Sequence, residues 1–92
     1  MTIDDRIHLN AIEYGLNERI FRQTLECESN LDPMAIGDSG TSVGIAQIHL
    51  PAHPDVSKEE ALDPEFAIRW AAKHFAQGHA YWWTCWKQRD PN

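Results

Sequence analysis

Apolar residues recur three or four positions apart in three segments of the chain, which predicts three amphipathic helices. The first helix is expected over residues 3–14, with Thr2 as its N-cap and Gly15 as its stop. The third is expected over about 64–77, because the Asp-Pro pair at 63–64 combines an N-cap with a residue suited to the first turn. The residues expected to face the core from this third helix are Ile68, Ala71, Ala72 and Phe75.

The second helix is expected over about 17–29, and its inward face carries two neighbouring rows of residues. These rows are Ile20, Thr24 and Cys27, and Phe21, Leu25 and Glu28. Glu28 continues an apolar row, which places a carboxyl on the inward face at the negative end of the helix dipole. Burial and the dipole both raise the pKa of such a carboxyl, as a general acid requires near neutral pH. The alternative is that Glu28 turns into solvent at a frayed helix end.

Between the second and third helices the chain becomes polar and rich in turn-forming residues. Residues 34–45 contain three glycines among polar side chains, which predicts a β-hairpin with left-handed positions. Residues 49–55 contain two prolines and are expected to form a loop. The Ser-Lys-Glu-Glu pattern at 57–60 is a capping box, which predicts a short helical turn.

Composition and charge narrow the classes of partner. A chain of 92 residues is expected to form a single domain, 1–92, near the low end of sizes that fold alone. Its 42% hydrophobic content and four tryptophans indicate a packed globule, which we expect to be a monomer. The net charge of −6 argues against nucleic acid as a partner. The sequence has no apolar run long enough for membrane insertion.

The two cysteines are Cys27 and Cys85. A disulfide between them would contribute about 4 kcal/mol in the chain-entropy model, and the alternative is two buried free thiols. We favour the disulfide, because the domain is small and the C-terminal tail has little else to hold it. Two cysteines without a CxxC pair make a poor zinc site. Prolines also separate the candidate ligands His49, His53 and Asp55, so no metal and no other cofactor is expected.

The two ends of the chain allow several interpretations. Residues 1–6 carry acids and no apolar core, so they are not a signal peptide. A cytosolic protein, release by lysis and a chain trimmed of its leader all remain open. The tail, 79–92, holds Tyr81 and three tryptophans, which indicates either a lid on the core or a platform for sugars. A lid is the commoner use, and an interaction module built on this tail is a further alternative.

Several spaced motifs between residues 27 and 50 occur in a recognisable order. They are Glu28-Ser29, then Pro33-x-Ala35, then Gly37-Asp38-x-Gly40-x-Ser42-x-Gly44-Ile45-x-Gln47-Ile48. Together they resemble the lysozyme-like superfamily, and most of all the catalytic domain of soluble lytic transglycosylases. The resemblance covers roughly residues 3–77. It implies a mainly α, lysozyme-like α+β fold, in which three main helices and a small β-hairpin line the substrate cleft.

The resemblance also implies an activity and roles for single residues. The family cleaves the β-1,4 bond between N-acetylmuramic acid and N-acetylglucosamine in peptidoglycan strands and leaves a 1,6-anhydromuramyl end. Glu28 would match the single catalytic acid/base, since the substrate's own acetamido group replaces a second carboxylate. Ser29 would orient Glu28 or contact the sugar, and Gln47 would contact the glycan. The other residues expected to bind substrate are Ser42, Ile48, His49 and Tyr81, the last in place of a Tyr-Asn pair that this chain lacks.

Two related groups suggest alternatives to the transglycosylase reaction. Goose-type lysozymes carry a Gly-Asp that Gly37-Asp38 resembles, so Asp38 could position water for hydrolysis, although their later second Asp is replaced here by His49. The Cys-Glu-Ser sequence is similar to the resuscitation-promoting factors, which are small secreted muralytic domains with a disulfide. By these resemblances, a location in the cell envelope or outside the cell is expected. A non-catalytic glycan-binding relative of the fold is the remaining alternative.

Overall fold

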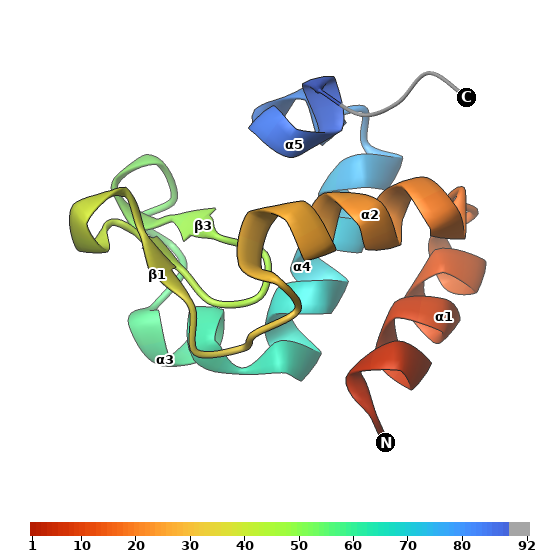
Figure 1. Ribbon diagram of the computed structural model, residues 1–92, viewed down its shortest axis with the longest axis horizontal. Helices are drawn as coiled ribbons and strands as arrows, with labels where there is room; N and C mark the ends of the chain where they lie inside the picture. Colours follow the sequence, from red (N-terminus) through yellow and green to blue (C-terminus); the bar gives the residue numbers. More distant parts are fainter. Residues whose placement is uncertain (89–92) are drawn as a thin grey trace.

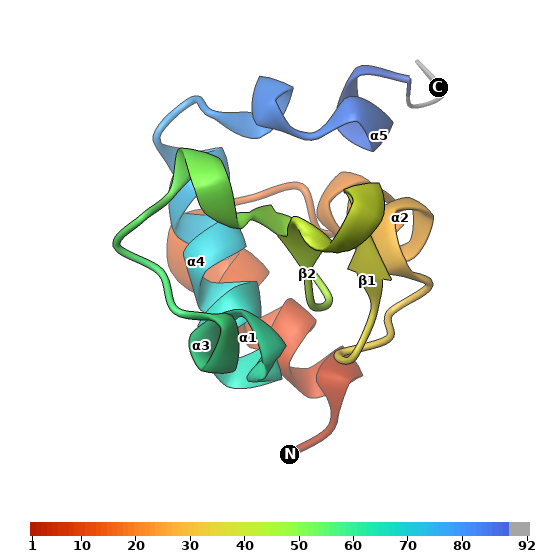
Figure 2. The ribbon, with the colours of Figure 1, turned by 90° about the vertical axis from the view of Figure 1, so that its left-hand side faces the viewer.

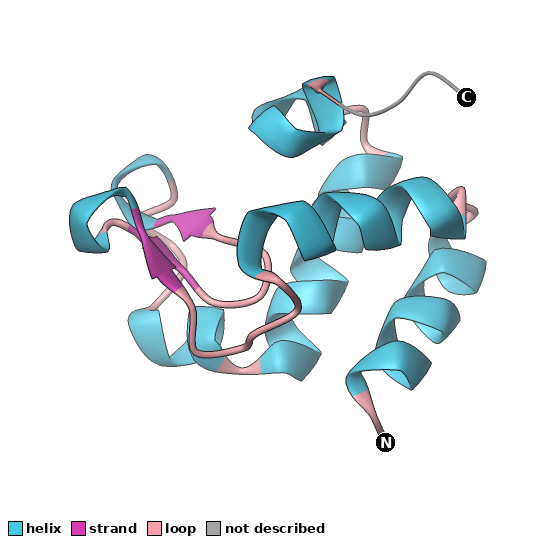
Figure 3. Cartoon of the chain, in the orientation of Figure 1, coloured by secondary structure: helices cyan, strands magenta, loops and turns pink. Residues whose placement is uncertain are grey.

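The structure is a computed structural model that describes residues 1–88. Within that range it is mainly helical, with five α-helices, three short 3-10 helices and one small antiparallel sheet (Figures 1 and 3). The α-helices are α1 (Ile3–Tyr14), α2 (Glu18–Ser29), α3 (Lys58–Leu62), α4 (Pro64–Ala76) and α5 (Thr84–Lys87). The strands are β1 (Ile36–Gly37), β2 (Ser42–Val43) and β3 (Ile48–His49). The 3-10 helices are η1 (Asp38–Gly40), η2 (Leu50–Ala52) and η3 (Ala80–Trp82).

Local capping explains where the long helices begin and end, and it confirms the three predicted helices. Thr2 caps α1 by accepting a hydrogen bond from the Asp5 N–H, and Gly15 ends that helix in the left-handed conformation at φ 66°. Asn17 caps α2 by accepting from the Ile20 N–H. Asp63 does the same for the Glu65 N–H at the start of α4. Each of these hydrogen bonds spans at most three residues, so each follows directly from the local sequence.

The core lies where α1, α2 and α4 meet the inner residues of the sheet. The face predicted for α4 is confirmed, with Ile68, Ala71 and Ala72 fully buried and Phe75 packed against the same cluster. The second helix needs one correction, because Cys27 is exposed rather than part of a buried row. Cys27 instead forms a disulfide with Cys85 of the tail and is not part of the hydrophobic core cluster.

The sheet corrects the prediction of a simple hairpin and of a loop over residues 49–55. Its strand order is β1-β2-β3, with antiparallel pairing of Gly37 with Ser42 and of Ser42 with His49. The chain turns back into β3 because Gln47 adopts a left-handed conformation at φ 47°. The sheet and α3 lie to one side of the packed long helices (Figure 1). As a result, β3 forms one wall of the space that the tail covers.

The tail segment from residue 79 to 88 closes over the body of the protein. Figures 1 and 2 both show it along one edge, above α2 and α4. Trp83 is buried and its indole Nε1–H donates to the Ala46 carbonyl at 2.8 Å, while a disulfide joins Cys27 to Cys85. The predicted disulfide is therefore present. Among the described helices, none is both long enough and apolar enough to cross a membrane.

Candidate active site

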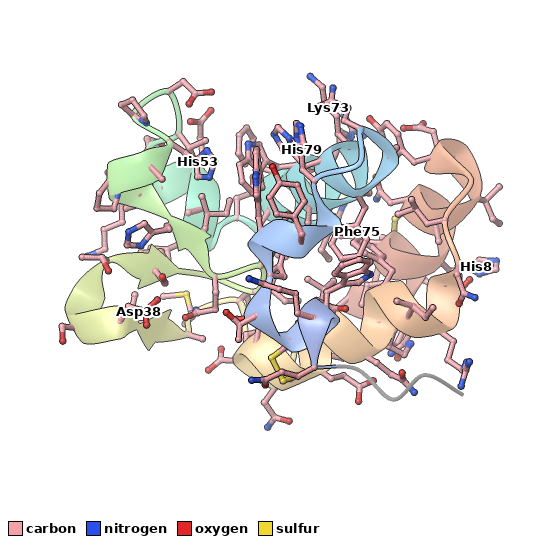
Figure 4. All side chains as sticks on the ribbon, turned by 90° about the horizontal axis from the view of Figure 1, so that it is seen from above. His8, Asp38, His53, Lys73, Phe75 and His79 are labelled. Carbon is pink, nitrogen blue, oxygen red and sulfur yellow. A yellow bond between two sulfur atoms is a disulfide. The ribbon has the colours of Figure 1, made fainter. Side chains whose placement is uncertain are left out.

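A cleft of about 570 Å³ separates the sheet from the tail. Its size falls within the roughly 300–1,000 Å³ of typical small-molecule sites. Figure 4 looks down on it from the tail side, with Asp38 and His53 on the sheet side. The lining residues are Glu28, Asp38, Ser42, Gln47, Ile48, His49, Ala52, His53, Trp70, Trp82, Trp83 and Thr84. One wall is thus polar and built by the hairpin, and the other is aromatic.

Glu28 projects from the last turn of α2 into this cleft. Its Oε2 accepts a hydrogen bond from the Cys85 N–H at 3.1 Å. Burial raises the pKa of Glu28 above its ordinary value of 4.5, the Cys85 amide opposes that shift, and the negative charge of Asp38 adds to it. The side chain is partly buried rather than turned into bulk solvent. Within residues 1–88 no donor contacts Oε1, which leaves this oxygen for a ligand.

Three hairpin residues form a hydrogen-bonded chain on the polar wall. The Ser42 hydroxyl donates to Oδ2 of Asp38 at 2.5 Å. Since that uses its only hydrogen, the contact of 3.4 Å to Nδ1 of His49 requires the histidine to be the donor. Nδ1 of His49 then carries the proton, and in a neutral ring Nε2 keeps a free lone pair. The register that pairs Ser42 with His49 is what brings these two side chains together.

Gln47 and Ile48 form the floor between the two walls. The amide Nε2 of Gln47 donates to the carbonyls of Ala35 and Gly44, at 3.1 and 2.9 Å, so both of its hydrogens are used inside the hairpin. Only Oε1 remains for a ligand, and it sits where a Cβ on Gly37 would lie 2.4 Å away. Ile48 is buried and adds an apolar surface beside these polar groups. The absence of a side chain at residue 37 is therefore what makes room for the Gln47 amide.

The aromatic wall is assembled from three separate parts of the chain. His53 contacts Trp70 of α4 edge to face, with ring centroids 4.8 Å apart, and lies 5.0 Å from Trp82 of the tail. Trp82 stacks on His79 at 4.2 Å with an interplanar angle of 17°. The indole of Trp82 remains 39% exposed at the rim. Exposed and partly exposed indole faces can stack on the apolar faces of sugar rings.

The structure brings most of the predicted site residues together, with two exceptions. Ser29 is buried, and its single hydroxyl hydrogen is directed to main-chain carbonyls instead of the cleft, with the Ile45 oxygen at 2.7 Å and the Leu25 oxygen at 3.1 Å. Tyr81 is 53% exposed and is not among the lining residues. Ser29 ties the end of α2 to the segment after the hairpin, so it can fix the position of Glu28 without touching a ligand.

Six of the lining residues were not among the individual site residues predicted from the sequence. They are Ala52, His53, Trp70, Trp82, Trp83 and Thr84. Trp70 is not among the residues of its helix that were expected to face the core, and His53 was considered as a metal ligand and given no role in binding substrate. The density of tryptophan in the tail indicated a lid or a sugar platform, but nothing in the sequence indicated which earlier residues it would meet.

This arrangement can supply a general acid to a ligand in the cleft. A carboxyl with a raised pKa faces a hydrogen-bonded carboxylate across a cleft that also offers apolar stacking surfaces. Over residues 1–88, no three His, Cys, Asp or Glu side chains are grouped closely enough to hold a metal ion. The carboxyl, hydroxyl, imidazole and amide groups that line the cleft can transfer protons and form hydrogen bonds.

Comparison of the chain with protein-family models, with curated proteins and with solved structures finds no match in any of the three.

Proposed function

We propose that this protein cleaves the glycan strands of peptidoglycan, as a lytic transglycosylase of the lysozyme-like superfamily. The observation that carries the proposal is the position of Glu28. Its partly buried carboxyl, with a raised pKa, points into a cleft between a glycine-rich hairpin and an aromatic wall. The order of the motifs from Glu28 to Gln47 supports the same reaction, because they supply an acid and polar contacts on facing sides of one groove.

In the proposed reaction the proton of Glu28 is used and then regenerated. Protonated Glu28 donates to the oxygen of the β-1,4 bond, and the N-acetylglucosamine leaves with that proton. The neighbouring acetamido group of the muramyl sugar supports the positive charge at C1. The ionised Glu28 then takes the proton from the C6 hydroxyl, whose oxygen bonds to C1 and forms the 1,6-anhydro ring. The free Oε1 is available for these transfers, while the Cys85 N–H holds Oε2 in place.

Hydrolysis is the second candidate, and the hydrogen-bonded hairpin residues favour it. Ser42 holds the Asp38 carboxylate on the wall opposite Glu28, where it can orient a water molecule. Against it, His49 stands at the position where goose-type lysozymes carry a second Asp, so that second acid is missing from this chain. A water molecule would then replace the C6 hydroxyl as the nucleophile and leave a reducing end.

The decisive experiment measures the loss of turbidity of purified cell walls and identifies the products by mass spectrometry. Glu28→Gln keeps the size of the side chain and removes the transferable proton, so activity is expected to fall at least about 1,000-fold. Glu13→Gln, on an exposed position of α1, removes one charge away from the cleft and serves as the control. Equal activity of wild type and Glu28→Gln would remove Glu28 from the mechanism. Binding of chitooligosaccharides without any cleavage by wild type would favour a non-catalytic glycan-binding protein.

Asp38→Asn separates the two reactions. If Asp38 orients water, the variant loses reducing-end products. If the reaction is transglycosylation, anhydro products persist, and the pH at which activity declines on the alkaline side moves down. That shift is expected because Asp38 raises the pKa of Glu28, so its neutralisation lets Glu28 ionise at lower pH. An unchanged alkaline limb with unchanged products would show that the two carboxyl groups do not interact.

The disulfide supports a location outside the reducing cytosol. Disulfides such as Cys27–Cys85 form and persist in secreted and periplasmic proteins and are rare in cytosolic ones. The cell envelope or the extracellular space is therefore the proposed location, where peptidoglycan is accessible.

A further inference from the structure

A second groove, of about 490 Å³, lies behind the aromatic wall of the cleft. One side is the outer stripe of α4, and the other is the loop before α3 together with the first turns of α3. The lining residues are Asp55, Val56, Glu60, Phe66, Arg69, Trp70, Lys73, His74 and Gln77. Trp70 borders both cavities, so the second groove continues the surface of the proposed active site.

The charges of this groove are divided between its two sides. Arg69 and Lys73 stand one helical turn apart on α4, and both are exposed. Asp55 and Glu60 lie on the opposite side, and Glu60 is already used in the capping box with Ser57. Over residues 1–88, neither Arg69 nor Lys73 forms an ion pair, although the chain carries 14 acidic residues. By contrast, Arg22 is paired with Asp4 and with Glu26.

The floor between these charges is apolar and aromatic. Val56 is buried, and Phe66 and Trp70 are partly buried against the core. Burial, with His79 as the next cause, lowers the pKa of His74, so this ring is neutral at pH 7 and adds no charge at that end. A ligand that complements this groove covers an apolar strip and presents carboxylates to one side and an amine to the other.

We propose that this groove binds the peptide stem of peptidoglycan, with its carboxylates at Arg69 and Lys73 and its amine at Asp55. The inference rests on the proposed function, since the stem is attached to the muramyl sugar whose bond is cleaved. A stem carries free carboxylates and a side-chain amine on a short extended backbone, which matches the divided charges. Trp70 provides continuity, because a strand lying in the cleft brings its peptide to the other side of this indole. The groove would then favour strands that still carry their peptides.

The test compares peptide-bearing glycan strands with the same strands after an amidase has removed the peptides. The variants are Arg69→Gln, Lys73→Gln and the double variant. The control is Lys58→Gln, which also removes an exposed positive charge but lies outside the groove. On peptide-bearing strands the double variant is expected to need about tenfold more substrate for half-maximal rate. On stripped strands it is expected to match wild type. Equal losses on both substrates, or an equal loss in Lys58→Gln, would overturn the proposal.

A binding measurement keeps this inference separate from the proposed activity. A soluble stem peptide with an acetylated N-terminus is titrated into the uncleaving Glu28→Gln protein, and amide chemical shifts are followed by NMR. The proposal is supported if the peptide shifts the amide signals of residues 69–73 and these shifts vanish in a folded Arg69→Gln/Lys73→Gln variant. This outcome supports peptide binding in the groove even if no glycan is cleaved. Shifts confined to other surfaces, or none at millimolar peptide, rule the groove out even if the enzyme is active.

Discussion

At the scale of single residues, the pKa of Glu28 is determined by three influences, of which two raise it and one lowers it. Removal from water favours its neutral form, and so does the nearby negative charge of Asp38, whereas the Cys85 N–H favours the ionised form. Burial is the largest influence, so the pKa of Glu28 is raised. A single amide hydrogen bond thus positions the carboxyl without restoring its ordinary acidity.

The raised pKa predicts how the stability of Glu28→Gln changes with pH. The pKa of Glu28 is higher in the folded protein than in the unfolded chain, so ionisation of this group favours unfolding. Below the ordinary pKa of 4.5 the group is neutral in both states and the wild-type protein keeps its full stability. That stability falls as the pH rises through the pKa of the folded protein. Gln cannot ionise, so the variant should match wild type at about pH 4 and exceed it increasingly toward about pH 8. Urea unfolding across this range measures the difference, with Glu13→Gln as the reference. A difference that is constant with pH would contradict the raised pKa.

At the scale of elements, the hairpin is held against the helices by close contacts of the main chain. Gly44 lies at φ 83°, and a Cβ there would come within 1.8 Å of the Ala61 carbonyl oxygen in α3. Ser29 fastens the end of α2 to the same segment through its 2.7 Å hydrogen bond to the Ile45 carbonyl. These contacts set the position of the polar wall relative to Glu28.

The cost of replacing Gly44 has two parts, its left-handed backbone conformation and its close approach to α3, and a comparison with Gly40 separates them. Gly40 also has a positive φ, of 96°, but a Cβ at that residue meets nothing within 4 Å. Gly40→Ala is therefore expected to cost about 1 kcal/mol for the left-handed conformation alone. Gly44→Ala adds a clash with rigid backbone and is expected to cost about 3 kcal/mol or more. Urea unfolding of both variants gives the comparison, and equal losses would mean that the turn and α3 are not in rigid contact.

At the scale of the whole molecule, the tail turns a groove in the body of the protein into a walled cleft. It supplies Trp82, Trp83 and Thr84 to the lining. Its connections to the rest are the buried indole of Trp83 and the disulfide, which spans 58 residues of sequence. The disulfide also places the Cys85 N–H beside Glu28. Stability and the geometry of the acid are therefore linked through one covalent bond.

Removal of the disulfide should weaken both properties. Cys27→Ser/Cys85→Ser is expected to lose about 4 kcal/mol of unfolding free energy, because the unfolded chain regains the freedom that the long loop had removed. Wall-cleaving activity should fall as well, since the tail is held less firmly over Glu28. Urea unfolding and turbidity assays of wild type with and without reductant provide the measurement. Reductant should not change the stability or the activity of the double variant. The prediction is contradicted if reduced wild-type protein is as stable and as active as oxidised wild-type protein.

The features that follow from the sequence alone are those whose interactions are local or have only one possible partner. The caps at Thr2, Asn17 and Asp63 act over at most three residues, so the helix starts could be read directly from the order of side chains. With only two cysteines, an intramolecular disulfide could have only one pairing. Likewise, one apolar row of α2 continues to Glu28, so helical periodicity predicts that its carboxyl lies on the inward face of the helix.

Only the tertiary structure decided the features that depend on distant contacts. The strand β3 is two residues long and exists because it pairs with β2, so no propensity within Ile48–His49 could predict it. That same pairing orders Ser42 and His49 beside Asp38. The meeting of Trp70 with the tail, and the inward turn of Ser29, depend on how helices pack against segments at least 12 residues away in sequence. Periodicity shows which side of a helix is apolar, but packing alone determines what that side touches.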